Sequence, residues 1–306
     1  MTKRPLIIIA GPTAVGKTKA SVELAKAIHG EIISADSMQV YRMLDIGSAK
    51  IKEEEKEGVP HHLIDVLDPK EEFNVMIFRK MAMDVLEGIY ERGHIPVICG
   101  GTGFYIQSVL YDISFPDEPT DRAYREMLYE KAEKEGPEAL FSMLQRVDPE
   151  SALRIPMNNV KRVARALEFY HEVGEPISAH NDREREKESP FDFRYFVLYR
   201  DRSETYERID RRVDEMMEEG LLTEVKRLMD YGVKPEMTSM QGLGYKQLYQ
   251  ALLGNMTVEE AVERTKIETR HFAKRQITWF KREKDTIWVD VEKENLLDVY
   301  KIRPFS

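Results

Sequence analysis

The stretch GPTAVGKT, residues 11–18, has the residue types and spacing of a loop that binds phosphate. Its glycines let backbone N–H groups surround an anionic oxygen, and a helix that follows directs the positive end of its dipole to the same place. Lys17 supplies a cation for an outer phosphate, and Thr18 supplies a hydroxyl ligand for Mg²⁺. A glycine-rich turn without a ligand is the alternative. The residues expected to bind a phosphate or diphosphate are Gly11, Pro12, Thr13, Ala14, Val15, Gly16, Lys17 and Thr18.

Asp36 follows a short apolar stretch, EIISA, that predicts a second buried strand. In open α/β sheets ligands bind beyond the carboxyl ends of the strands, so we expect Asp36 to lie near the phosphate loop. Its carboxylate there either assists the metal or accepts a proton from a nucleophile, and a turn or helix-capping role is the alternative. The glycine run 100–103 permits close approach to a ligand, to which Thr102 can donate, but an ordinary turn explains it equally well.

Two basic stretches stand out in a chain whose net charge is −9. Residues 264–284 carry eight Lys or Arg against two Glu, with aromatic side chains between them, which suits contact with a polyanion. Lys274 or Arg275 is also a candidate clamp on a leaving diphosphate. Residues 158–170 bring Lys161, Arg162 and Arg165 together. For both stretches the alternative is an amphipathic helix with a solvated charged face.

The elements that position these residues alternate between strands and helices. Short apolar runs predict strands, and helical periodicity separates them. This alternation predicts an α/β fold with a P-loop NTPase-like parallel sheet core flanked by helices, interrupted by a helical insertion domain. Residues 1–115 and 193–306 are assigned to the core, and residues 116–192 to the insertion. Strands are expected at 5–10, 31–35, 95–99, 193–200 and 286–291, and helices at 17–29, 75–92, 203–231, 242–253 and 257–284.

Composition excludes several classes of protein. No apolar run approaches the length of a membrane span, and the apolar start of the chain is too short for a signal peptide. A single cysteine, Cys99, excludes an internal disulfide and argues against a cysteine-built metal site. The adjacent pair His61 and His62 is expected to be structural, because neighbouring side chains rarely ligate one ion. A cytoplasmic monomer without membrane contact is expected.

Several stretches taken together resemble one family, the tRNA dimethylallyltransferases, also called tRNA isopentenylpyrophosphate transferases. The resemblance runs from Leu6 to about Phe280 in family order, and 115–155 and the C-terminal tail match only loosely. No zinc-finger extension of the eukaryotic kind follows, which implies a bacterial-type enzyme. The matching stretches are GPTAVGKT, ISADSMQVYRMLDIGSAK, VPHHLID, ICGGTGFY, NVKRVARALE, LGYKQL and AKRQITWF.

The resemblance implies that the loop holds the diphosphate of dimethylallyl diphosphate rather than ATP. The five-carbon group is then transferred to N6 of the adenosine 3′ of the anticodon, in tRNAs that read codons starting with U, with Mg²⁺ as cofactor. Asp36 matches the family's proposed base, and Thr13 matches a threonine at the reacting end of the diphosphate. Lys17, Thr18 with Mg²⁺, and Arg275 are expected to neutralise the leaving group. The target base is expected to flip out of its stack.

The same resemblance assigns contacts with the tRNA anticodon stem-loop. They fall after the second strand, in the glycine run and in the insertion. The assigned residues are Asp36, Ser37, Met38, Gln39, Thr102, Arg125, Lys161, Arg162, Val163, Ala164 and Arg165.

Three other functions share some of these features. A nucleotide or small-molecule kinase has the same loop but consumes ATP. A non-catalytic RNA-binding protein can keep a relic of the loop, although Lys17, Thr18 and Asp36 are all intact here. An enzyme that prenylates free adenine nucleotides is the nearest rival, and the two basic stretches favour a macromolecular acceptor instead.

Overall fold

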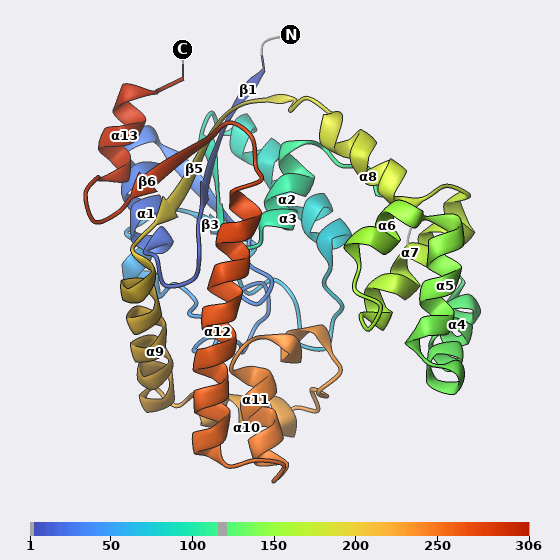
Figure 1. Ribbon diagram of the computed structural model, residues 1–306. Coiled ribbons are helices and arrows are strands. Elements are labelled where there is room, and N and C mark those ends of the chain that lie inside the picture. Colours follow the sequence, from blue (N-terminus) through green and yellow to red (C-terminus); the bar gives the residue numbers. More distant parts are fainter. Residues whose placement is uncertain (1–2, 116–120, 306) are drawn as a thin grey trace. The chain divides into compact units, whose positions relative to one another are not determined.

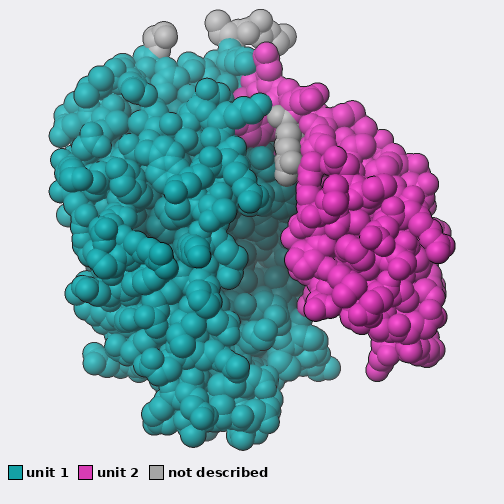
Figure 2. Space-filling model, in the orientation of Figure 1, with its two compact units in different colours: residues 1–110, 190–306 teal, residues 111–189 magenta. Residues whose placement is uncertain are grey.

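The computed structural model describes residues 3–115 and 121–305, apart from the side chain of residue 185. The described residues form two compact units, one within 1–110 and 190–306 and the other within 111–189 (Figure 2). The borders therefore lie a few residues before those expected at 115/116 and 192/193. The later border moves because the returning strand begins at Phe191 rather than at residue 193.

Unit 1 contains a parallel sheet of six strands in the order β3-β2-β4-β1-β5-β6 (Figure 1). The predicted α/β fold with a parallel sheet is confirmed, and each of the five expected strands is present. The sixth, β3, was not predicted because it is only two residues long. The strands are β1 (Arg4–Ala10), β2 (Gly30–Ser34), β3 (His61–His62), β4 (Ile95–Gly100), β5 (Phe191–Tyr199) and β6 (Thr286–Asp290).

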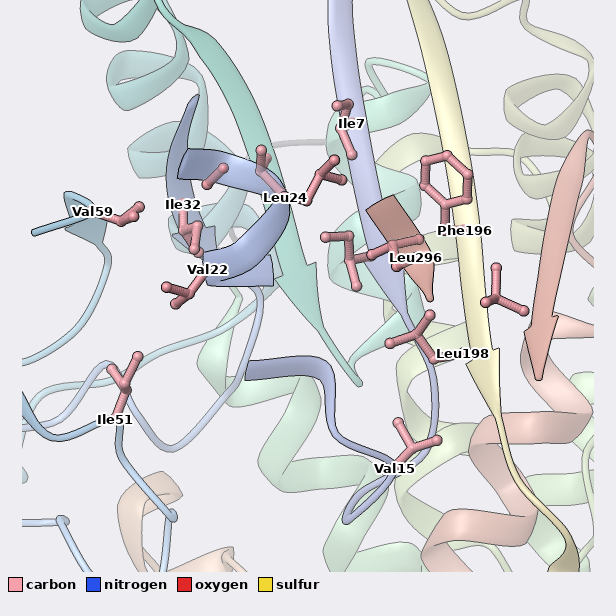
Figure 3. Close-up of a cluster of buried hydrophobic side chains, with 14 residues drawn as sticks. Ile7, Val15, Val22, Leu24, Ile32, Ile51, Val59, Phe196, Leu198 and Leu296 are labelled. Atoms are coloured by element: carbon pink, nitrogen blue, oxygen red, sulfur yellow. The ribbon is translucent and has the colours of Figure 1, made fainter. Parts of the chain in front are cut away.

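Both faces of this sheet are covered, which is typical of parallel sheets. On one face Ile7 and Ile9 pack in a cluster with Leu24 of the first helix and Leu296 of the last (Figure 3). Successive side chains of a strand point to opposite faces, so Ile8, which is also fully buried, lies under the helices of the other face.

The helices of unit 1 differ from the expectation mainly after β5. The stretch 203–231 is two helices rather than one, because Gly220 between them has a left-handed backbone with φ 102°. The helix expected from residue 242 begins after Gly244, which also has a positive φ. The unit 1 helices are α1 (Lys17–Ile28), α2 (Val75–Glu91), α3 (Gly103–Leu110), α9 (Arg202–Glu218), α10 (Leu221–Asp230), α11 (Tyr245–Leu252), α12 (Val258–Phe280) and α13 (Leu296–Ile302), with short 3₁₀ turns at Glu53–Lys56 and Thr238–Gln241.

The described part of unit 2 is helical. Its core is apolar, with Leu128, Leu140 and Leu167 from three helices among its buried members. The buried carboxylate of Asp148 fixes the first turns of two helices, since it accepts hydrogen bonds from Ser151 and Ser178. The helices are α4 (Arg122–Glu135), α5 (Pro137–Val147), α6 (Pro149–Arg154), α7 (Val160–Val173) and α8 (Ile177–Glu186).

Candidate active site

Three neighbouring strands end at one edge of the sheet, and residues that follow them line one cavity. The phosphate loop follows β1, Asp36 follows β2 and Thr102 follows β4. Helices α9 and α12 contribute further walls. The cavity has a volume of about 1490 Å³, and every residue that lines it belongs to unit 1.

The phosphate loop has glycines where its backbone needs them, and most of its residues line the cavity. Gly11 and Gly16 have φ values of 146° and 105°, which side chains rarely adopt. A Cβ on Gly11 would also lie 2.5 Å from the carbonyl oxygen of Leu198. Thr13, Ala14, Gly16, Lys17 and Thr18 line the cavity. The side chain of Val15 instead lies in the core cluster (Figure 3), so it anchors the loop and leaves only the backbone of this residue to contact a ligand.

Lys17 spans the loop to which it belongs. Its ammonium donates hydrogen bonds to the carbonyl oxygens of Gly11, at 3.0 Å, and Pro12, at 2.7 Å. Burial lowers the pKa of Lys17 to about 8, although the negative charge of nearby Asp36 opposes this shift. An ammonium has three donors, so one remains for a phosphate oxygen.

Asp36 uses one carboxylate oxygen for a turn and leaves the other available. Its Oδ1 accepts from the backbone N–H of Met38 at 2.8 Å and of Gln39 at 3.3 Å. Its Oδ2 has no hydrogen-bond partner among the described residues and can accept a proton. The turn role and the acid–base role proposed from sequence are therefore compatible in one side chain. Ser37, Met38 and Gln39 line the cavity beside it.

Gln276 of α12 was missed by the sequence analysis. Its side-chain oxygen accepts from the backbone N–H of Thr13 at 2.9 Å, and its amide donates to the carbonyl oxygen of Gly101 at 2.9 Å. A Cβ on Gly101 would lie 2.1 Å from that amide nitrogen, and one on Gly103 would lie 2.2 Å from Trp279. The glycine run therefore exists because α12 packs directly on it. The sequence signal for this contact was a polar residue, Gln276, placed three residues before Trp279 and so on the same face of the helix.

Arginines just after β5 and in α9 were also missed. Arg208 donates to the carbonyl oxygen of Ala14 at 3.0 Å, and Arg200 donates to that of Val15 at 3.3 Å. Burial lowers the pKa of Arg212, and the negative charge of Asp36 partly offsets the effect. Arg208 and Arg212 line the cavity one helical turn apart. That four-residue spacing in ERIDRRVD was the sequence signal for a cationic face toward the loop.

The basic stretch in α12 divides into two parts. Lys266 pairs with Asp214 and Arg270 with Asp210, both on α9, so the first part is a helix–helix contact. The expectation of one basic polyanion surface along the whole stretch is thus wrong for this part. Arg275 lines the cavity, as expected of a diphosphate clamp, and Lys274 does not.

The oxygen ligands that line the cavity could bind Mg²⁺ only together with a phosphate that supplies further ligands. Thr18 places a hydroxyl on the cavity wall. Within residues 3–115 and 121–305, no group of three or more His, Cys, Asp or Glu is arranged to hold a metal. Mg²⁺ in phosphate-transfer sites takes few protein ligands and several from phosphate and water, which this set permits. His61 and His62 do not form such a group, and His62 contacts Glu31.

The residues of unit 2 that were expected to contact tRNA differ in exposure and in ion pairing. Lys161 and Arg162 are exposed in the first turn of α7, without an ion-pair partner among the described residues. Val163 and Ala164 are fully buried in the core of the unit, so the expectation that they contact tRNA is wrong for these side chains. Arg125 holds the buried carboxylate of Glu168 through two hydrogen bonds at 2.7 and 3.0 Å. Arg165 lies 3.7 Å from the same carboxylate.

Comparison with known families accounts for this combination of phosphate loop, acid and helical insertion. A family model described as IPP transferase matches residues 39–283, and one described as isopentenyl transferase matches residues 5–70. The chain belongs to the IPP transferase family. The two matches overlap at residues 39–70 and together span residues 5–283, so every residue that lines the cavity lies within them.

Members of this family resemble the chain over nearly its whole length. A tRNA dimethylallyltransferase of Lachnoclostridium phytofermentans is 53% identical over 95% of this chain and 93% of its own. The crystal structure of a tRNA isopentenylpyrophosphate transferase from Bacillus halodurans has a TM-score of 0.73 and 43% identity, covering 98% and 94% of the two chains. A eukaryotic dimethylallyltransferase, solved while acting on tRNA, has a TM-score of 0.82 and 31% identity, with 99% of this chain and 81% of that one covered.

None of the helices formed by the described residues is both long and apolar enough to span a bilayer.

Proposed function

We propose that this protein transfers the dimethylallyl group of dimethylallyl diphosphate to N6 of the adenosine 3′ of the anticodon, in tRNAs that read codons starting with U. The observation that carries the proposal is that a phosphate loop and a carboxylate with an available oxygen line the same cavity. The family's named activities, tRNA dimethylallyl and isopentenyl transfer, agree with this chemistry.

In the proposed reaction the bond between the allylic carbon and the diphosphate oxygen breaks, and a bond from N6 to that carbon forms. The proton that N6 loses goes to Oδ2 of Asp36, which helps because an exocyclic purine amine is a poor nucleophile. The electron pair of the broken bond stays on the diphosphate. Lys17 and the hydroxyl of Thr13 face the leaving group from the loop, and cations of α9 and α12 reach it from the other walls.

Mg²⁺ is proposed as the cofactor. When bound to the diphosphate, with Thr18 as its protein ligand, it supplies positive charge that stabilises the leaving group. Lys17, Arg208, Arg212 and Arg275 supply the rest from this chain. Their convergence from three elements on one cavity supports a strongly anionic ligand.

The proposed macromolecular acceptor is the tRNA anticodon stem-loop. Lys161 and Arg162 support it, because cations at the positive end of a helix dipole are unfavourable unless they meet an anion. The target base must leave its stack to enter the cavity, so we propose base flipping. A tRNA substrate also supports a cytoplasmic location. We propose a monomer, because the phosphate loop, Asp36 and the cations that the reaction needs are already brought together within one chain.

The test is a mass spectrum of an unmodified anticodon stem-loop after incubation with the protein, Mg²⁺ and dimethylallyl diphosphate. We expect the mass of one dimethylallyl group to be added at the adenosine after the anticodon. A parallel reaction offers AMP as acceptor, and another offers ATP without a prenyl donor. Prenylation of AMP alone would move the acceptor to free nucleotides, and ATP turnover without prenylation would identify a kinase.

A further inference from the structure

The loop Asp45–Ala49, which forms one wall of the cavity, is held by a carboxylate from a distant part of the chain. Glu224 of α10 accepts from three successive backbone N–H groups, those of Asp45 at 3.0 Å, Ile46 at 2.9 Å and Gly47 at 3.1 Å. It also accepts from the hydroxyl of Tyr245 at 2.7 Å. Successive backbone N–H groups of this kind form an anion-binding nest, and here the anion is a side chain of the protein itself.

Loss of any hydrogen bond to Glu224 would be destabilising, because its carboxylate is buried. The side chain is fully buried, and the nearest cation, the guanidinium of Arg227, lies 4.0 Å away. Four hydrogen-bond donors therefore compensate the desolvation of the charge. Burial, together with the charge of Glu224, raises the pKa of Tyr245 well above its usual value, so its hydroxyl remains a donor.

The loop fits closely against the residues that surround Glu224. A Cβ on Gly47 would lie 2.6 Å from the ring of Tyr245 and 2.8 Å from Leu221. Any displacement of the carboxylate or the ring must therefore be passed on to the loop.

A second contact connects this loop to the proposed base. The side-chain amide of Gln39 donates to the carbonyl oxygens of Ser48 and Ala49, at 3.2 and 3.4 Å. Its side-chain oxygen accepts from Ser34 at 2.9 Å. The backbone N–H of the same residue donates to Oδ1 of Asp36. Glu224 is thus linked to Asp36 by hydrogen bonds at both ends of the loop and at Gln39, joined by the covalent chain between them.

We propose that Glu224 is a positioning residue for prenyl transfer. It fixes the loop Asp45–Ala49 and, through Gln39, the orientation of the Asp36 carboxylate toward the acceptor amine. Glu224 does not itself line the cavity, so it acts without touching substrate. This inference rests on the proposed function, in which Asp36 accepts the proton.

The first test is the variant Glu224→Gln, which keeps the shape of the side chain but turns a hydrogen-bond donor toward the donors of the nest. We expect kcat to fall roughly tenfold to a hundredfold, because small misplacements of a reacting group have effects of that size. The KM for dimethylallyl diphosphate should stay within about twofold, because the phosphate loop is held by other contacts.

The matched control is Glu31→Gln. Glu31 is a buried carboxylate of the same unit, held by Arg92, His62 and His94, and it does not line the cavity. Both variants should lower Tm, and only Glu224→Gln should lower kcat. A comparable loss of kcat in Glu31→Gln, or an unchanged kcat in Glu224→Gln, overturns the proposal. If Glu224→Gln does not fold, Gly47→Ala is judged by the same criterion, since its Cβ would push the loop away from Tyr245 and Leu221.

Amide hydrogen exchange separates this proposal from the proposed function. Exchange at Asp45, Ile46 and Gly47 should be faster in Glu224→Gln than in the wild type and unchanged in Glu31→Gln. A wild-type protein that prenylates no acceptor contradicts the proposed function but leaves this measurement intact. Unchanged exchange at the three amides would overturn the positioning role by itself.

Discussion

At the scale of single residues, the two oxygens of Asp36 have separate tasks. Asp36→Asn keeps an oxygen that can accept from Met38, so the turn should survive while the proton acceptor is lost. We expect turnover of an anticodon stem-loop to fall by about a hundredfold or more, in line with loss of a general base. Binding of the stem-loop, measured by fluorescence anisotropy, should stay within about threefold. Turnover close to the wild-type value would exclude Asp36 as the base.

The lowered pKa of Lys17 leads to a pH dependence of ligand binding. In the free protein, burial holds this pKa at about 8, and an anionic ligand favours the ammonium form. The affinity for dimethylallyl diphosphate, measured by calorimetry without acceptor or metal, should therefore decline above pH 8, approaching about tenfold per pH unit. Lys17→Arg stays charged throughout this range, so its profile should be flat. An equally steep decline in that variant would assign the pH dependence to another group.

At the scale of elements, helix α12 fixes the phosphate loop through one side chain. Gln276→Leu leaves the N–H of Thr13 and the carbonyl of Gly101 without partners, and each unmade bond costs about 1–3 kcal/mol. We expect kcat/KM for dimethylallyl diphosphate to fall roughly tenfold to a hundredfold in steady-state assays. Thr278→Val is the matched control, because its hydroxyl bonds only to a carbonyl of the same helix. Equal kinetics in the two variants would contradict the role of Gln276.

The same helix shows which parts of the site could be predicted from sequence. The phosphate loop and Asp36 were predictable, because local spacing and the ends of buried strands determine their positions. Gln276 and Glu224 were not, since the backbone groups that they hold lie at least 175 and at least 177 residues away along the chain. Val163 was assigned to tRNA contact because the family resemblance covers residues 161–165 as one stretch, whereas its apolar side chain packs in the core. Only the packing of helices decides which face of such a segment meets solvent.

At the scale of the whole molecule, a net charge of −9 opposes RNA binding, so local basic sites must supply the attraction. We expect charge reversal at Lys161 and Arg162, both exposed and without ion-pair partners among the described residues, to weaken stem-loop binding about tenfold or more. The slope of log K against log salt should decrease by about 2, one for each lost phosphate contact.

Lys131→Glu with Lys134→Glu is the matched control for this prediction. These lysines lie in the same unit and change the total charge equally, but they pair with Glu135 at 2.6 Å and Glu130 at 2.8 Å on their own helix. Their reversal tests whether total charge alone governs binding. A loss of affinity as large as that of the Lys161 and Arg162 variant, with the same change in salt slope, would mean that the start of α7 has no special part in docking RNA. A smaller effect, with the wild-type slope retained, would assign the contact to that helix.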